Sequence, residues 1–307
     1  MPISYETAQR IAAVWEESDS LREAMRRAGL KTTNYKTMKR HRREAEELLH
    51  VRLESKQVLP EEVAHYNSDK PYTIVVFSDA HFWPSSRSPA YRILINVITM
   101  LGPEVIVDLG DSLDAATISR HPKLGWEDRP TLEAEIKSCQ EALDEISFPG
   151  SKLYRVIGNH DMRFDMRLAN CAGEFEGVTG FSMAELFPKW EHCTAIMFNN
   201  TLYAKHRWKN GKHAGYNNTK ESGKSTITGH LHRLNIRPYS DLNGTRYGIE
   251  AGTLANPYGP QFAYTECNPV DWQCGFIVIT VDQNWIYPEA IEVKNKSAWF
   301  RGQKILA

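Results

Sequence analysis

The sequence predicts an α/β protein with a small all-helical segment at its N-terminus. Three short apolar runs, 73–77, 105–107 and 153–157, each end in a turn and are typical of buried strands. Helical patterns at 90–101 and 131–146 lie between these runs. Because a strand, helix, strand series implies parallel pairing, we expect these strands to run parallel. Further short strands are expected toward the C-terminus, at 234–237, 246–250, 276–281 and 286–293.

Bulk composition is that of an ordinary globular protein. Hydrophobic residues make up 41% and charged residues 24% of the 307 residues, so one large domain with or without a small addition is expected. The net charge of −1 indicates no partner by itself. The 5 cysteines form no C-x-x-C pair, which argues for a reducing compartment. With no visible secretory signal or membrane-spanning apolar run, we expect a cytoplasmic protein without a membrane partner.

Residues of metal-binding types recur in five short islands along the chain. In order, the islands are Asp79-Ala80-His81, Gly110-Asp111-Ser112-Leu113-Asp114, Gly158-Asn159-His160-Asp161, His206 and Gly229-His230-Leu231-His232. The first three islands directly follow the predicted strands. Open α/β sheets gather their ligands at the carboxyl ends of strands. The sequence therefore predicts a metal site.

The ordered islands resemble the pattern of the calcineurin-like metallophosphoesterase superfamily. That pattern is Asp-x-His, Gly-Asp-x-x-Asp, Gly-Asn-His-Asp/Glu, His and Gly-His-x-His, and every element is present here without substitution. The resemblance covers roughly residues 72–290. It implies a four-layer αββα sandwich, in which two mixed β-sheets are flanked by helices, and it implies hydrolysis of phosphate esters.

The same resemblance implies two metal ions. The first would be held by Asp79, His81, Asp111 and His232. The second would be held by Asp111, Asn159, His206 and His230. Asp111 would bridge the two ions, because a carboxylate has two oxygens. Mixed oxygen and imidazole ligands suit Mn²⁺, the ion we expect, or Fe, Zn²⁺, Ni²⁺ or Co²⁺, better than Mg²⁺ or Ca²⁺.

Catalytic roles also follow from the resemblance. His160 would protonate or steady the leaving oxygen, and Asp114 would orient His160 as a hydrogen-bonded carboxylate. Asp161 either assists this histidine or holds backbone amides in its turn. Arg163 is either a contact for a substrate phosphate or an ordinary surface arginine.

The residue directly before His206 departs from what is usual in the family. The family usually has a small residue directly before this histidine, and Lys205 takes that place here. His192 and His213 are the alternative ligands. The loop that follows His206 carries residues that either line a groove for a polyanion or are ordinary surface residues, namely Lys209, Lys212 and His213.

The domain organisation is predicted from a change in composition. We expect a helical domain at 1–55, a linker at 56–71 and the metallophosphoesterase domain at 72–307. In the N-terminal domain, Ser20 and Glu23 form a candidate capping box and Gly29 is expected to end that helix. The three helices expected there are at 6–17, 20–28 and 34–53, and with their tight second turn they resemble a helix-turn-helix module.

Basic residues dominate the second and third of these helices. Between Arg22 and Arg43 the only acidic residue is Glu23, and the basic residues are Arg22, Arg26, Arg27, Lys31, Lys36, Lys39, Arg40, Arg42 and Arg43. Such clusters neutralise backbone phosphates, so we expect DNA to bind through residues 1–55. The alternative is a helical hairpin with a solvated basic face that serves packing or oligomerisation. The oligomeric state is not predicted.

The leading functional prediction is a DNA-directed phosphodiesterase or nuclease, similar in architecture to proteins carried by bacteriophages. One alternative is a phosphodiesterase or phosphomonoesterase of small molecules such as nucleotides. Another is a DNA-binding regulator whose phosphoesterase domain is vestigial. The protein-phosphatase branch is disfavoured because it carries Gly-Asp-x-Val-Asp-Arg-Gly and Gly-Asn-His-Glu, whereas this chain has Asp114-Ala115-Ala116 and Gly-Asn-His-Asp.

Overall fold

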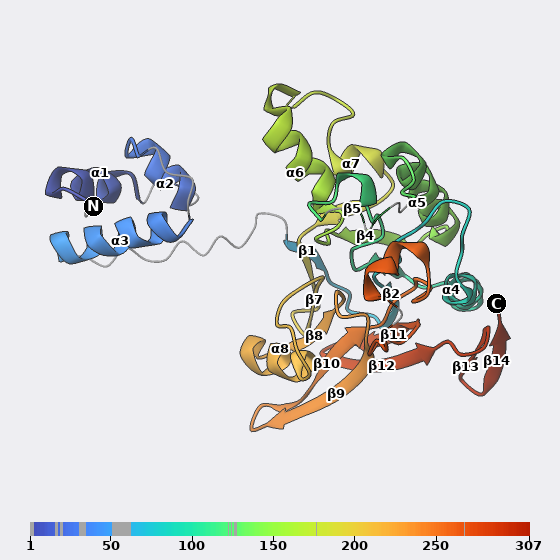
Figure 1. Ribbon diagram of the computed structural model, residues 1–307. Coiled ribbons are helices and arrows are strands. Elements are labelled where there is room, and N and C mark those ends of the chain that lie inside the picture. The colour runs from blue at the N-terminus through green and yellow to red at the C-terminus, as the bar shows by residue number, and fades with distance from the viewer. Residues whose placement is uncertain are drawn as a thin grey trace. The chain divides into compact units, whose positions relative to one another are not determined.

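The chain divides into two compact units, residues 1–61 and 62–307 (Figure 1). The computed structural model describes residues 3–15, 18, 21–30, 35–50, 63–121, 123, 125, 128–175, 177–266 and 268–307. Within these residues, no helix combines the length and the apolar character that crossing a membrane requires.

Three helices make up the N-terminal unit. They are α1 (Tyr5–Trp15), α2 (Leu21–Arg27) and α3 (Tyr35–Leu49), close to the ranges expected from the sequence. The helices bury one apolar cluster between them, formed by Ala8, Ile11, Trp15, Ala24, Met25, Ala28, Met38 and Ala45. The apolar positions that predicted these helices therefore form the core of the unit.

Gly29 ends α2, as expected. Its φ is +79°, a left-handed conformation that glycine adopts without a steric penalty. Its N–H donates to Arg26 O at 2.9 Å, and the N–H of Leu30 donates to Met25 O at 2.9 Å, which satisfies carbonyls at the helix end. The side chains of the expected capping box, Ser20 and Glu23, lie outside the described residues.

Two six-stranded mixed sheets form the centre of the second unit. The first sheet has the order β12-β11-β2-β3-β4-β5. Its strands are β2 (Tyr72–Phe77), β3 (Val105–Asp108), β4 (Lys152–Val156), β5 (Glu191–Cys193), β11 (Gly275–Asp282) and β12 (Trp285–Glu292). Strands β2 to β5 run parallel, as expected for the first three, and β11 pairs antiparallel with both β2 and β12.

The second sheet has the order β1-β6-β7-β8-β10-β9. Its strands are β1 (Val63–Tyr66), β6 (Ala195–Phe198), β7 (Leu202–Lys205), β8 (Ser225–Thr228), β9 (Leu234–Asp241) and β10 (Gly244–Ala251). Strands β7, β8 and β10 run parallel to one another, whereas β9 lies antiparallel to β10 and β6 antiparallel to β7. Separate from both sheets, β13 (Ser297–Phe300) and β14 (Gln303–Leu306) form a hairpin.

One strand lies where the sequence predicted a linker. β1 (Val63–Tyr66) falls within 56–71 but pairs in parallel with β6, so this part of the expected linker belongs to the second unit. Four residues are too few to show a clear alternating pattern, and the partner strand comes about 130 residues later in the chain. The rest of the expected linker up to residue 62 lies outside the described part.

Helices cover both outer faces, which gives the four-layer sandwich expected from the sequence (Figure 1). Alternate residues of β2 face two different hydrophobic cores. Val75 and Phe77 pack toward the helices, whereas Ile74 and Val76 pack toward the second sheet. Helices α4 (Pro89–Leu101) and α5 (Leu132–Ile146) cover the first sheet, and α8 (Ala214–Ser222) covers the second.

Close backbone contact fixes the position of α8. A Cβ atom at Gly248 of β10 would lie 2.2 Å from the carbonyl oxygen of Gly215 in α8, so only glycine fits there. The remaining short elements connect the layers, namely η1 (Ala116–Ile118), α6 (Met162–Cys171), η2 (Gly173–Phe175), α7 (Met183–Leu186) and η3 (Pro260–Thr265).

Candidate metal centre

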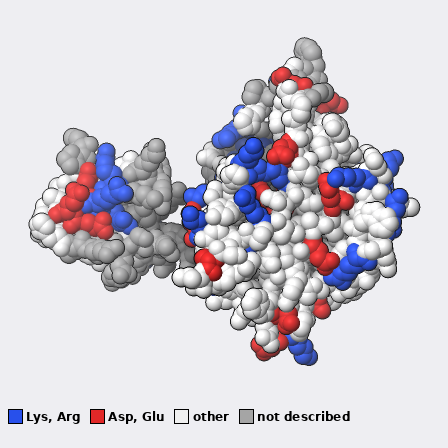
Figure 2. Space-filling model, turned by 90° about the horizontal axis from the view of Figure 1, so that it is seen from below, with Lys and Arg blue, Asp and Glu red and all other residues white. Residues whose placement is uncertain are grey.

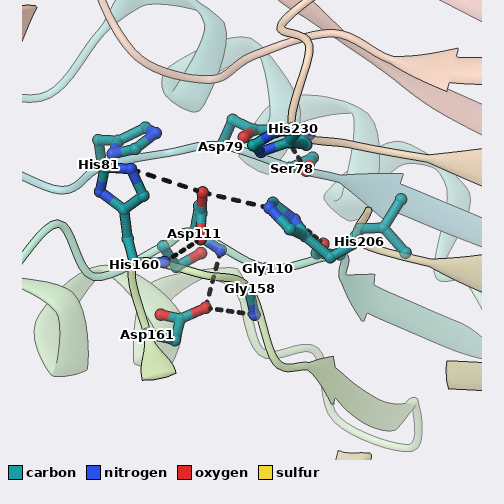
Figure 3. Close-up of polar contacts among 12 residues, drawn as sticks. Ser78, Asp79, His81, Gly110, Asp111, Gly158, His160, Asp161, His206 and His230 are labelled. Atoms are coloured by element: carbon teal, nitrogen blue, oxygen red, sulfur yellow. Dashed lines mark hydrogen bonds and ion pairs between the residues drawn. The ribbon is translucent and has the colours of Figure 1, made fainter. Parts of the chain in front are cut away.

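The candidate site lies where strands of both sheets end. Strands β2, β3 and β4 of the first sheet lead into the loops of Asp79, Asp111 and His160. Strands β7 and β8 of the second sheet lead into the loops of His206 and His230. Figure 3 shows Asp111 between His206 and His160, with Asp79 and His230 beside them. The five islands, far apart in the sequence, therefore meet at one place.

Five of the predicted ligands have a left-handed backbone. Their φ values are +51° at Asp79, +40° at His81, +56° at Asp111, +70° at His230 and +58° at His232. Each residue in this conformation lowers the stability of the fold by about 1–3 kcal/mol, and it persists only where surrounding contacts fix the backbone. Contacts between the loops provide this support, as where the His81 N–H donates to Asp111 O at 3.0 Å. Strained turns of this kind concentrate at functional sites.

Among the described residues, ligand-type atoms gather in three neighbouring groups, in each of which one atom per residue lies within 4.8 Å of the others. The first group is formed by Asp79, His81 and His232. The second group is formed by Asp111, His206 and His230. The third group, His81, Asp114 and His160, contains the candidate catalytic pair. The first two groups lie within the two ligand sets that the resemblance implied, but Asp111, the expected bridge, belongs only to the second group.

Several of these atoms are buried and make no hydrogen bond, namely Asp79 Oδ1, His81 Nε2, Asn159 Oδ1 and His206 Nε2. His206 Nε2 lies 3.2 Å from Asp111 Oδ2, and His232 Nε2 lies 3.2 Å from Asp79 Oδ1, both at ion-pair distance. An unsatisfied buried polar atom costs about 1–3 kcal/mol. A divalent cation satisfies oxygen and imidazole donors together, so these residues fit the implied metal pair.

Acceptors on the far side of three imidazole rings fix their orientation. His206 Nδ1 donates to Leu109 O at 2.8 Å. His81 Nδ1 and His160 Nδ1 both donate to Asp114 Oδ1, at 3.0 Å and 2.7 Å. His81 and His206 thereby have their Nε2 free for the centre, the usual arrangement behind a metal-binding histidine, whereas His160 Nε2 lies 3.3 Å from Arg163 Nη2. The expected contact of Asp114 with His160 is present, and its contact with His81 was not foreseen.

Asp161 holds backbone amides, one of the two roles left open by the sequence. Its carboxylate is fully buried and accepts from the N–H groups of Asp111 at 2.7 Å, Gly158 at 3.0 Å and Leu113 at 3.1 Å. It also accepts from Arg155 Nη2 at 2.7 Å. Asp161 therefore ties the second and third islands together.

Arg155 and Asp108 support the centre and were missed in the sequence. Arg155 is fully buried, and its Nε lies 3.1 Å from Asp108 Oδ2. Asp108 Oδ1 in turn accepts from the N–H of Gly110 at 3.1 Å and from the hydroxyl of Ser112 at 2.8 Å. The sequence did carry a signal for this pair, since each of two otherwise apolar strands contains a charged residue. Charged side chains are almost never fully buried unless they are paired.

Electrostatics in the centre favour cations. Burial opposes the imidazolium of His206, but the nearby carboxylate of Asp111 outweighs it and raises the pKa of His206 to about 10. Burial and the charge of His206 lower the pKa of His230 to about 4. Burial by itself raises the pKa of the Asp114 carboxyl, but hydrogen bonds from His160 and His81 outweigh burial and hold that pKa well below the usual range. The carboxylates of the centre thus attract positive charge.

His206, and neither of its alternatives, lies among the ligand atoms. His192 Nε2 lies 3.4 Å from Phe187 O, and His213 Nδ1 lies 3.1 Å from Arg237 Nη1 at the start of α8. Neither belongs to a described group of ligand-type side chains. In the loop after His206, Lys209 pairs with Glu221 of α8 at 2.8 Å, so the structure does not single this loop out as a groove.

Arg163 points into the site from the start of α6. Its Nη1 donates to Asp114 O at 2.7 Å, and its Nη2 lies 3.3 Å from His160 Nε2. The guanidinium therefore contacts the candidate catalytic histidine and does not extend freely into solvent.

The glycines of the islands are required by close packing. A Cβ at Gly158 would lie 2.1 Å from Asp111 Oδ1. A Cβ at Gly229 would lie 2.0 Å from Ser78 Oγ. The Gly-Asn-His and Gly-His elements therefore need glycine because another loop of the centre occupies that space.

Two curated proteins of bacteriophages are similar in sequence. The gene 54 protein of Mycobacterium phage D29 is 26% identical over 248 residues, which cover 72% of this chain and 93% of that protein. The gene 54 protein of Mycobacterium phage L5 is 25% identical over 243 residues, with the same coverage of 72% and 93%. These relatives agree with the expected likeness to phage proteins. No protein-family model matches the chain.

Solved structures show weaker similarity. Vacuolar protein sorting 29 of Cryptosporidium parvum is 13% identical, covers 78% of this chain and 97% of its own, and has a TM-score of 0.41. YfcE, a phosphoesterase of E. coli, is 15% identical, covers 71% and 98%, and has a TM-score of 0.36. The Vps29 of Entamoeba histolytica solved with zinc is 13% identical, covers 76% and 98%, and has a TM-score of 0.41. At these scores, none of them assigns a substrate to this chain.

Proposed function

We propose that residues 62–307 form a two-metal phosphoesterase of the calcineurin-like superfamily. The observation that carries this proposal is the convergence of carboxylate and imidazole side chains from five loops, together with buried atoms of three of these loops, Asp79 Oδ1, His81 Nε2, Asn159 Oδ1 and His206 Nε2, that make no hydrogen bond. Mixed oxygen and nitrogen donors favour transition-metal ions, and Mn²⁺ is the ion we expect. Such a pair, when bound, supplies Lewis-acid charge to phosphoryl oxygens and activates a water.

The ligand assignment follows the two groups of side chains. One ion is assigned to Asp79, His81, Asp111 and His232. The other is assigned to Asp111, Asn159, His206 and His230. Asp111 is the proposed shared ligand, because its Oδ2 lies 3.2 Å from His206 Nε2 of the second set and its backbone O accepts from the N–H of His81 of the first set at 3.0 Å.

His160 is the proposed proton donor to the leaving oxygen. Its Nε2 lies 3.9 Å from Asp111 Oδ2, and Asp114 fixes the ring through Nδ1. Burial opposes the charged ring, but Asp114 and Asp111 outweigh it and raise the pKa of His160 above 6.5. This shift favours the protonated ring, the form that a general acid requires. Arg163, beside this nitrogen, is placed to contact a phosphoryl oxygen.

DNA is the proposed substrate, with the N-terminal unit as the part that binds it. The support is the basic composition of the second and third helices, together with relatives encoded by phages. Arg26 and Arg43 are exposed on α2 and α3. Counterions released from DNA phosphates would drive such binding and make it strongly salt-dependent.

Ion pairs on α3 favour the second candidate, a phosphoesterase of small molecules whose N-terminal helices serve assembly. Arg40 lies 3.5 Å from Glu44, and Arg42 lies 3.6 Å from Glu46, so these arginines are partly neutralised. Figure 2 shows acidic and basic side chains side by side on the visible face of each unit. Among the residues coloured in that view, neither unit presents a face of one sign.

Hydrolysis after reconstitution with Mn²⁺ tests the phosphoesterase function. The substrates are bis-p-nitrophenyl phosphate, p-nitrophenyl phosphate, and labelled single- and double-stranded DNA. We expect the wild type to cleave diesters, and His160→Ala to lower kcat by about 10²–10⁴. Cleavage of DNA lost in both His160→Ala and Asp111→Asn supports a nuclease, whereas activity confined to the small esters supports the second candidate.

DNA binding is tested by its salt dependence. The variant Arg26→Gln/Arg43→Gln removes two exposed charges from the helical unit, and Lys296→Gln/Lys304→Gln removes two exposed charges near the C-terminus as a control. We expect the first variant alone to reduce the slope of log K against log salt by about 2. Equal slopes for both variants and the wild type would refute the proposed role of the N-terminal unit.

A further inference from the structure

The segment between β10 and β11 is anchored to the metal loops at both of its ends. At its start, the Leu254 N–H donates to Ser78 O at 3.1 Å, and the Thr253 hydroxyl donates to Asp79 O at 2.6 Å. At its end, the Gln273 N–H donates to His232 O at 2.9 Å. The short helix η3 and the aromatic residues of this segment are thus held beside the candidate centre.

Two aromatic rings of this segment pack against predicted ligands, and a third ring packs against one of these two. The Phe262 ring centroid lies 5.2 Å from that of His81 and 5.6 Å from that of His232. The Trp272 centroid lies 4.4 Å from His232 and 4.9 Å from Phe262. The Tyr264 centroid lies 6.2 Å from Phe262. The rings therefore form one continuous group that begins at the imidazoles and extends away from them.

Exposure distinguishes the inner ring from the outer two. Phe262 is 3% exposed and supports its neighbours, whereas Tyr264 is 58% exposed and Trp272 is half-buried. Among the contacts of the described residues, neither the Tyr264 hydroxyl nor the Trp272 indole N–H makes a hydrogen bond. Packing of the fold thus accounts for Phe262 but leaves the two outer rings available to solvent.

The outer tyrosine also lies within the electrostatic field of the centre. After burial, the charge of Asp114 is the largest influence that raises the pKa of the Tyr264 phenol, and Arg163 acts in the opposite direction. The charges of Asp114 and Arg163 therefore act on this phenol.

We propose that Tyr264 and Trp272, supported by Phe262, form a stacking platform for the nucleobase attached to the phosphate at the metal centre. This inference rests on the proposed phosphoesterase function and narrows its substrate to nucleotides with an unpaired base, alone or in a single strand. Every base has a π-face, so such a platform accepts all four bases. A base inside a duplex is stacked on its neighbours and does not reach the platform.

Two esters that differ only in the nucleoside test the platform by hydrolysis. Thymidine 5′-(p-nitrophenyl phosphate) carries a base, and ethyl p-nitrophenyl phosphate has the same leaving group without one. We expect Tyr264→Ala to raise KM for the thymidine ester by about 10-fold and to leave the ethyl ester unchanged. Tyr264→Phe keeps the ring and should behave as the wild type, and Trp272→Ala should repeat the effect of Tyr264→Ala.

Calorimetry provides a readout that does not depend on turnover. The Mn²⁺-loaded protein is titrated with thymidine 5′-monophosphate and with inorganic phosphate. We expect the nucleotide to bind about 10-fold more tightly, and Tyr264→Ala to abolish that difference. Base-dependent binding without hydrolysis of either ester would refute the phosphoesterase function and retain the platform.

The platform itself would be overturned by either of two results. One is equal binding of nucleotide and phosphate by the wild type, with both esters hydrolysed, which would leave the phosphoesterase function intact. The other is an equal loss for both esters in Tyr264→Ala, which would show that the rings only shield the centre.

Discussion

The guanidinium of Arg155 donates to Asp161 at 2.7 Å, and both side chains are completely buried. Through this pair, the strand that precedes the third island is joined to the carboxylate that holds the second and third islands together. Asp108 completes the arrangement on the other side of the guanidinium, at 3.1 Å. The metal loops thus depend on a buried cation that lies outside all five islands.

Replacing Arg155 with methionine should destabilise the protein. The variant leaves the carboxylates of Asp108 and Asp161 buried without their cation, which typically costs about 3–5 kcal/mol. Urea unfolding measures the loss. The matched control is Lys152→Met on the same strand, whose ion pair with Glu191 is exposed and contributes about 0–1 kcal/mol. Equal stabilities for the two variants would contradict the role given to Arg155.

Asp114→Asn should impair both metal binding and turnover. Asp114 Oδ1 accepts hydrogen bonds from His81 and His160, and loss of such a partner typically costs about 10–100-fold in metal affinity or activity. We expect a lower Mn²⁺ affinity and a lower kcat for bis-p-nitrophenyl phosphate. Asp144→Asn, which loses only an exposed pair with Lys189, is the control. Wild-type affinity and kcat in Asp114→Asn would refute the assignment.

Glu135 should make stability decrease as the pH rises. The side chain is fully buried in α5 and accepts from the N–H of Ala116 at 3.0 Å. Burial, together with the charge of Asp114, raises its pKa from 4.5 to about 7. Because the folded state favours the protonated form, this stabilisation is complete below pH 4.5 and is lost as the pH rises through about 7.

Glu135→Gln removes this titration. Relative to the variant, the wild type should lose up to about 3 kcal/mol of unfolding free energy between pH 5 and pH 8. Urea unfolding at the two pH values measures the change, and Glu133→Gln, at an exposed position of the same helix, is the control. A difference between wild type and Glu135→Gln that stays constant over this range would show that Glu135 does not titrate as described.

The fold class was predictable from the sequence because its signals are local. The apolar runs before Asp79, Asp111 and Asn159 are strands, and the parallel order of the first sheet follows from the helices between them. The strands expected after residue 232 are also present, each within a few residues of the expected bounds. The meeting of the five islands follows in turn, since each lies just beyond a strand end.

The supporting parts of the site were not predictable, because their contacts join residues distant in sequence. Arg155 meets Asp108 only because β3 and β4 are neighbours, and no spacing along the chain indicates that pairing. Phe262 and Trp272 lie in an irregular segment without periodicity, and they reach His232 only because backbone hydrogen bonds anchor that segment. The short β1 was missed because its pairing partner determines it.

Metal stoichiometry tests the central claim most directly. Metal-free protein is reconstituted with Mn²⁺, excess metal is removed, and the bound metal per chain is measured by plasma mass spectrometry for the wild type and for Asp111→Asn. The two proposed ligand sets, which share Asp111, predict 2 ions per chain in the wild type and a clear loss in the variant. A wild-type chain that retains no Mn²⁺, or an Asp111→Asn chain that retains the full wild-type amount, would contradict a dinuclear centre bridged by Asp111.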